Sequence, residues 1–274
     1  MEDIAAERAA ETLLAEHTAN TKFKPFDPPD APATIPDAYD IQQRYVALLR
    51  DRHGEAVGYK VGLTSDAMQK FCGIDHPIAG VVLASRVRSS GAHVARSEFG
   101  RLGLEFEIAV RIKSDVPVGD GPCTAAMIAP HIDGVCAAIE LVDDRSADYT
   151  NLDVLALVAD NSWNAGIVLS EFAMPWPDLE AVRGRASKDG ADIGEGFGRE
   201  VLAREDDHRR LGKQADEIEG GQRIEIEFLV ERGNGRQADM VEQQGISVGF
   251  RFRRLHRADR TAGAADILNQ HRLL

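Results

Sequence analysis

Three acidic residues in two apolar segments are the first candidates for chemistry. The segment LGLEFEIAVRI (102–112) alternates between apolar and polar residues, which is typical of a strand. Side chains at i and i+2 of a strand lie on the same face, so Glu105 and Glu107 project together. Glu140 lies in the apolar segment 134–144, where an ionised carboxylate is costly unless it is paired or bound to metal. The three carboxylates predict an Mg²⁺ or Mn²⁺ site that leaves coordination positions for a substrate.

A second acidic pair has the same spacing and a different expected role. Glu225 and Glu227 are also i, i+2 in an alternating segment, 223–231. We expect this pair to face solvent and bind nothing, because polar residues surround it. Spacing alone leaves the same solvent-facing interpretation open for Glu105 and Glu107. Only the additional acid inside an apolar strand separates the two pairs.

Two further positions have both a functional and a structural interpretation. Lys60 lies in a short alternating segment, where it is either a proton carrier with a lowered pKa or a surface lysine. Composition alone favours the surface lysine. Asp160 and Asn161 precede a turn of small residues, where they either serve a site or cap local structure. In the segment 142–145, Arg145 is expected to form a structural ion pair with the neighbouring aspartates.

The elements that must position these residues form an α+β pattern. Apolar periodicity predicts helices over 4–16 and 37–52, the second with Asp37 as N-cap. Most later segments alternate as strands, among them 246–252, while 152–160 fits either a helix or a strand. We therefore divide the chain into an N-terminal helical arm, 1–55, and a β-rich metal-binding catalytic domain, 56–274.

Composition excludes several classes of protein. The 274 residues carry 32 basic and 45 acidic side chains, a net charge of −13, which argues against nucleic-acid binding. No apolar run reaches the roughly 20 residues that span a bilayer, and the acidic N-terminus does not have the pattern of a signal peptide. Three cysteines without a CxxC pair indicate a reducing compartment, so we expect a cytoplasmic protein. A GxG without a third glycine gives no dinucleotide site.

Four ordered motifs connect these residues to a known family. GYKVGLTSDAM, LEFEIAV, AAIELVDDRSADY and VADNSWNAGIVL together resemble the hydratase/decarboxylase branch of the fumarylacetoacetate hydrolase superfamily, over about residues 36–198. The resemblance implies a mixed β-sheet roll with an N-terminal helical arm and a divalent metal. Glu105, Glu107 and Glu140 match the family's metal ligands, and Lys60 matches its active-site lysine. Asp160 and Asn161 match a motif near the site whose role is left open.

The resemblance also implies an activity in the catabolism of aromatic ring-cleavage products. We rank first a hydratase that adds water to a 2-hydroxy-2,4-dienoate to give a 4-hydroxy-2-oxo acid. A 4-oxalocrotonate-type decarboxylase and a catalytically silent subunit are the alternatives. A homo-oligomer is expected, or a complex with a partner hydratase or decarboxylase. Residues 203–240 depart from the family pattern, since the charged stretch 202–217 replaces an apolar helix. We expect them to be the least ordered or the least family-like part of the body.

Overall fold

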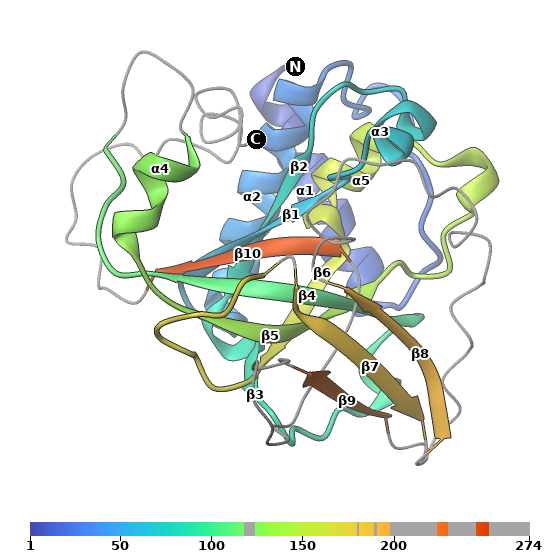
Figure 1. Ribbon diagram of the computed structural model, residues 1–274. Helices are drawn as coiled ribbons and strands as arrows, with labels where there is room; N and C mark the ends of the chain where they lie inside the picture. Colours follow the sequence, from blue (N-terminus) through green and yellow to red (C-terminus); the bar gives the residue numbers. More distant parts are fainter. Residues whose placement is uncertain (118–123, 180, 189–190, 198–223, 230–244, 252–274) are drawn as a thin grey trace.

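The computed structural model describes residues 1–117, 124–179, 181–188, 191–197, 224–229 and 245–251, and it has the predicted α+β class (Figure 1). The helices are α1 (Asp3–Thr18), α2 (Ile35–His53), α3 (Asp66–Cys72), α4 (Ala125–Ile128) and α5 (Val154–Ala159). The strands are β1 (Ala56–Gly62), β2 (Ile78–Leu83), β3 (Val87–Ser89), β4 (Leu102–Ile112), β5 (Ile132–Asp143), β6 (Asn164–Leu169), β7 (Arg183–Lys188), β8 (Ala191–Phe197), β9 (Ile224–Leu229) and β10 (Gly245–Arg251).

A mixed seven-stranded sheet forms the body, with the strand order β2-β1-β10-β4-β5-β6-β3. At its centre β4 pairs parallel with β10 and antiparallel with β5. The register of β4 and β5 places Glu105 directly opposite Glu140. A second sheet, with the order β8-β7-β9, lies below the first in the view of Figure 1. The β4–β5 pair therefore joins the two acidic segments that the sequence singles out.

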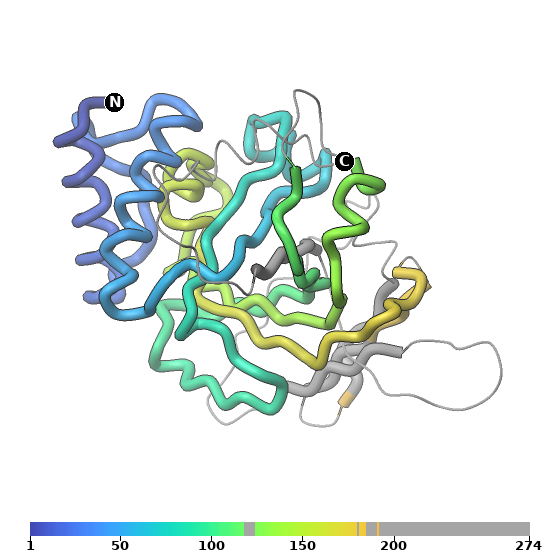
Figure 2. Tube along the Cα trace, turned by 90° about the vertical axis from the view of Figure 1, so that its left-hand side faces the viewer, coloured from blue at the N-terminus to red at the C-terminus, as the bar shows by residue number. Residues whose placement is uncertain are grey.

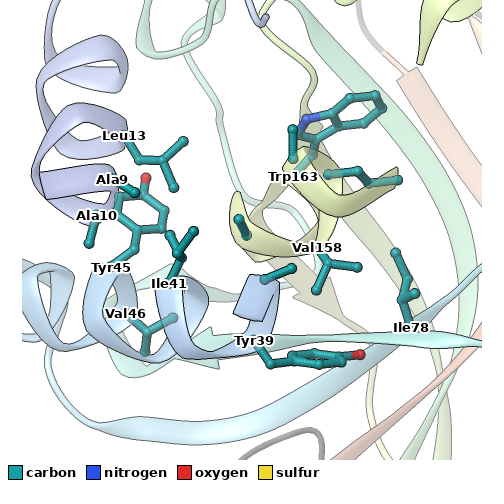
Figure 3. Close-up of a cluster of buried hydrophobic side chains, with 14 of the residues drawn as sticks. Ala9, Ala10, Leu13, Tyr39, Ile41, Tyr45, Val46, Ile78, Val158 and Trp163 are labelled. Atoms are coloured by element: carbon teal, nitrogen blue, oxygen red, sulfur yellow. The ribbon is translucent and has the colours of Figure 1, made fainter. Parts of the chain in front are cut away.

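Helices α1 and α2 lie side by side at one edge of the molecule (Figure 2). Their buried faces share one hydrophobic core with β2, α5 and Trp163 (Figure 3). Two polar side chains of α2 also hold the backbone of β2. Tyr39 Oη accepts from the Ala79 N–H at 2.8 Å, and Gln42 Nε2 donates to the Ala79 carbonyl at 2.9 Å and to Val158 of α5 at 2.7 Å. The helices thus fix β2 and α5 relative to each other.

The boundaries of several elements differ from the predicted ones. Asp37 is not the N-cap of α2, because Thr34 caps the helix by accepting from the Asp37 N–H. The Asp37 carboxylate instead accepts from the ammonium of Met1 at 2.6 Å. The ambiguous segment 152–160 contains α5, whose N-terminus is capped by Asp153. Strands β7 and β8 were not predicted, since their glycine-rich segments lack a clear alternation of apolar residues.

Two further observations concern the chain as a whole. Among the described residues, the structure contains no helix that is both long enough and apolar enough to cross a membrane. Most of residues 203–240 lie outside the described residues, so the expectation about their order stays a prediction.

Candidate metal centre and active site

The structure brings together the carboxylates of Glu105 and Glu107 on β4 and of Glu140 on β5. Each offers an oxygen atom, and these three atoms lie within 4.8 Å of one another. Glu107 and Glu140 are buried, while Glu105 is the most exposed of the three. The arrangement follows from the strand period, which places Glu105 and Glu107 on one face, and from the β4–β5 register, which adds Glu140.

The electrostatics of this carboxylate cluster fit a divalent cation. Burial raises the pKa of Glu140 above its ordinary value; the charge of Lys60 opposes this shift and that of Glu105 adds to it. A cluster of like charges becomes favourable when a proton or a cation lies between them. Oxygen ligands on opposite sides of one Mg²⁺ are about 4 Å apart, so the observed spacing and the hard oxygen donors fit Mg²⁺ or Mn²⁺.

Lys60 on β1 is buried beside the cluster, so the interpretation as a surface lysine is wrong. Its Nζ lies 3.2 Å from Oε2 of Glu140 and donates to the carbonyl oxygen of Ser162 at 3.3 Å. A lowered pKa of Lys60, which is expected when a cation neutralises the carboxylates, stays a prediction. Burial lowers the pKa of Lys60, but the charges of the three carboxylates outweigh burial and keep that pKa above its ordinary value.

A glycine on the neighbouring strand leaves space for the side chain of Lys60. Gly80 of β2 lies opposite Lys60 in the β1–β2 register. A Cβ atom at Gly80 would lie 3.1 Å from Cγ and 3.2 Å from Cδ of Lys60, and 2.6 Å from the carbonyl oxygen of Asn161. Any larger residue at this position would displace either the lysine or the segment that contains Asn161.

Both polar ends of the Asn161 side chain hydrogen-bond to the backbone of β2 and hold that segment against the strand. Its Oδ1 accepts from the Val81 N–H at 2.7 Å, and its Nδ2 donates to the Val81 carbonyl at 2.9 Å. Asn161, Ser162 and Trp163 all have positive φ angles, of 49°, 50° and 58°. Such a backbone persists only where its surroundings hold it. The two hydrogen bonds of Asn161 therefore help to fix the Ser162 carbonyl that accepts from Lys60.

Asp160 belongs to a second group of buried charges, which joins α1 to the end of α5. One carboxylate oxygen contacts Nε2 of His17, and the other accepts from Nη2 of Arg145 at 2.8 Å. Nη1 of Arg145 donates to Glu16 at 3.0 Å and to the Thr21 carbonyl at 2.7 Å. The side chain of Arg145 thus pairs with Asp160 and Glu16 rather than with the adjacent aspartates that the sequence suggested.

Asn164, at the start of β6, is a contact of the carboxylate cluster that the sequence did not single out. Its Nδ2 donates to Oε1 of Glu140 at 2.7 Å, and the residue is only 4% exposed. The motif ADNSWNAG contains Asn164, but nothing in its spacing separates this amide from Asn161.

The second acidic pair, Glu225 and Glu227, lies on β9. The backbone register places Glu225 opposite Ser187 and Glu227 opposite Arg185 on β7. The described side chains do not include those of β9, so the solvent-facing role of this pair stays a prediction.

Comparison with known proteins shows which enzymes this chain is similar to. No family model matches the chain. A 4-oxalocrotonate decarboxylase of Pseudomonas putida is 32% identical over 154 residues, which cover 54% of this chain and 57% of that protein. A 2-keto-4-pentenoate hydratase of Burkholderia vietnamiensis is 32% identical over 176 residues, covering 64% of this chain and 65% of that one. The match to the first of these curated relatives spans little more than half of its length.

A solved structure agrees with these relatives. The 4-oxalocrotonate decarboxylase from Pseudomonas putida G7, complexed with magnesium and adipate, superposes with a TM-score of 0.65 and 26% identity. The match covers 74% of this chain and 76% of that one. The predicted resemblance of the chain to 4-oxalocrotonate decarboxylases and 2-keto-4-pentenoate hydratases is therefore confirmed.

Proposed function

We propose that this chain, which resembles hydratases and decarboxylases of small 2-oxo acids, is a divalent-metal-dependent lyase. Its first expected reaction is the addition of water to a 2-hydroxy-2,4-dienoate to give a 4-hydroxy-2-oxo acid. The observation that carries the proposal is the group of three carboxylate oxygens within 4.8 Å of one another, beside a buried lysine. The named relatives support both the reaction class and the class of substrate.

Glu105, Glu107 and Glu140 would hold the cation, Mg²⁺ or Mn²⁺. When bound, the ion supplies Lewis-acid polarisation to the 2-oxo acid. The similar structure with magnesium supports a divalent ion. The chain contributes a rigid set of ligands, because two of the three carboxylates are buried on paired strands.

Lys60 is the proposed proton carrier. Its Nζ lies among buried groups beside Glu140, where the ammonium can give a proton to the bound acid and the resulting amine can take one back. Hydration of a dienoate and decarboxylation of an oxalocrotonate both require such a proton transfer, so one lysine serves either reaction. Its orientation comes from the Ser162 carbonyl and from the space above Gly80.

For Asp160 and Asn161 we propose positioning roles rather than contact with substrate. Both ends of the Asn161 amide bind Val81, and both carboxylate oxygens of Asp160 contact His17 or Arg145. Together they hold the segment whose Ser162 carbonyl accepts from Lys60. Their effect on turnover would therefore act through the position of the lysine.

The second candidate reaction is decarboxylation of 4-oxalocrotonate. It is favoured by the solved structure of a 4-oxalocrotonate decarboxylase, which matches about three quarters of each chain. A catalytically silent subunit is the third candidate, and the complete set of three glutamates and Lys60 argues against it. Assembly as a homo-oligomer, or with a partner hydratase or decarboxylase, remains a proposal.

Turnover of two substrates tests these alternatives. The full chain is incubated with Mg²⁺ and either 2-hydroxypenta-2,4-dienoate or 4-oxalocrotonate, and both ultraviolet absorbance and CO₂ release are followed. Loss of absorbance with the dienoate and no CO₂ release with 4-oxalocrotonate is the result expected of the hydratase, and CO₂ release identifies the decarboxylase. Glu107→Gln is the control, because it removes one proposed ligand. Mg²⁺ binding without turnover of either compound would contradict the proposed activity.

A further inference from the structure

The side chain of Asn164 has two polar ends, and the described residues provide a partner for only one of them. Nδ2 donates to Oε1 of Glu140 at 2.7 Å. Oδ1 is buried and has no hydrogen-bond partner within the described part of the chain. A buried amide oxygen that has lost its water without gaining a donor is destabilising, so native proteins supply a partner. The environment of Oδ1 therefore points to a group that binds there.

The orientation of the amide follows from the chemistry of its partner. Glu140 is paired with the Lys60 ammonium, and an ionised carboxylate only accepts hydrogen bonds, so the NH₂ end of Asn164 makes the contact. The reversed amide would place two acceptor oxygens in contact. The unpartnered end is consequently an acceptor, and the group that binds it must be a donor, such as a hydroxyl or a water molecule.

The unpartnered oxygen lies close to the carboxylate cluster. The O and N atoms of one amide are about 2.3 Å apart, which places Oδ1 within about 5 Å of Oε1 of Glu140. The other oxygen of Glu140 lies 3.2 Å from Nζ of Lys60 in an ion pair. The carboxylate is thus held by one hydrogen bond from Asn164 on β6 and by the ion pair with Lys60 on β1.

We propose that Asn164 is a positioning residue for Glu140, and that its Oδ1 accepts a hydrogen bond from a hydroxyl group or water of the ligand that the cluster binds. The inference rests on the proposed metal centre and extends it to a residue outside the three glutamates. Groups that orient metal ligands typically change metal affinity or activity 10–100-fold when they are removed.

Mg²⁺ binding to the full chain tests the donor end of Asn164. Isothermal titration of the metal alone is compared for wild type, Asn164→Leu, which keeps the branched side-chain shape without polar atoms, and Asn164→Ala, which avoids overpacking. Both variants should bind Mg²⁺ about 10–100-fold more weakly, since Glu140 loses its orienting donor. The matched control is Asn151→Leu, at an exposed asparagine, which should bind as wild type does. Circular dichroism shows whether each variant is folded.

The outcomes separate this inference from the proposed function. A wild-type chain that binds Mg²⁺, with folded Asn164 variants that bind it equally well, would overturn the role of Asn164 alone. A wild-type chain that binds no Mg²⁺ would overturn the metal centre itself. If one variant does not fold, the other decides the result.

A crystal structure of the Mg²⁺-loaded wild type tests the acceptor end. A water or ligand oxygen within about 3.2 Å of Asn164 Oδ1 is the expected result. A protein N–H or O–H donating to Oδ1 in that structure would overturn the second half of the proposal, because the oxygen would then have no need of a ligand.

Discussion

Two of the groups of buried charge in the described part of the chain differ in their balance of acids and bases. The carboxylate cluster brings three acids, Glu105, Glu107 and Glu140, together beside Lys60. The second group, which we call the α1 clamp, consists of Asp160, Glu16, Arg145 and His17. In the clamp every acid has a basic partner within hydrogen-bond distance.

The balance of acidic and basic groups distinguishes the carboxylate cluster, a candidate metal site, from the α1 clamp, a structural contact. Buried charge is costly, and the clamp offsets that cost with pairs from the protein itself. The carboxylate cluster gathers three carboxylates beside the Lys60 ammonium, and such a group of like charges favours a bound cation. Burial alone does not distinguish the two groups, because Glu140 and Asp160 are both almost completely buried.

Removal of Arg145 should give the largest loss of stability. Arg145→Met leaves Asp160 and Glu16 without their buried guanidinium partner, which should lower the free energy of unfolding by about 3–5 kcal/mol. Denaturant unfolding with Mg²⁺ and with EDTA should give the same difference. Arg44→Met is the control, because its ion pairs are on the surface and should contribute less than about 1 kcal/mol. A loss of similar size in both variants would contradict the structural role of the clamp.

Replacement of Lys60 should lower the rate of turnover without weakening metal binding. Lys60→Met should lower kcat by roughly 10²–10⁴-fold, the usual contribution of general acid–base catalysis. Mg²⁺ affinity should stay equal or rise, since Lys60 is not a ligand and its charge repels the cation. Steady-state kinetics and calorimetry measure the two quantities. A variant that loses metal instead of rate would exclude Lys60 as the proton carrier.

Mg²⁺ should stabilise the chain through the carboxylate cluster alone. At a concentration 100 times the Kd, a ligand that binds only the folded state adds about 2.7 kcal/mol to the free energy of unfolding. Glu107→Gln should abolish this increment. Asp160→Asn should keep it in full, although the variant is less stable from the start. Loss of the increment in Asp160→Asn would mean that the clamp, too, is needed for metal binding.

Neutralising one acid of the cluster should raise the free energy of unfolding, whereas breaking the clamp should lower it. In EDTA, Glu105→Gln should raise the free energy of unfolding by less than about 1 kcal/mol, because it relieves repulsion from Glu140. The same variant should bind Mg²⁺ more weakly in calorimetry. A clear loss of stability in EDTA would show that the cluster is balanced by charges other than Lys60.

The smallest effect is expected at the second acidic pair. Substitution of both Glu225 and Glu227 by Gln should change the free energy of unfolding by no more than about 0.5 kcal/mol, as for surface positions. Mg²⁺ affinity should be that of the wild type. Weaker Mg²⁺ binding would mean that the pair on β9 takes part in the metal centre.

Local patterns in the sequence were sufficient for the strands that carry the glutamates. Alternation predicted a strand over 102–112, the bounds of β4, because the two-residue period of a strand is a property of the backbone itself. The same period places Glu105 and Glu107 on one face wherever the strand lies. Glu140 was identified because an acid inside an apolar run needs a compensating partner.

Only the tertiary structure decided which groups meet. Lys60 reaches Glu140 and the Ser162 carbonyl, which is 102 residues away in sequence, and His17 meets Asp160 across 143 residues. Such contacts depend on strand register and helix packing, which no local period encodes. For the same reason Asn164 looked like any other amide, and Lys60 like a surface lysine, until β1, β5 and β6 were placed together. Sequence determined which residues could do chemistry, and long-range packing determined which of them are neighbours.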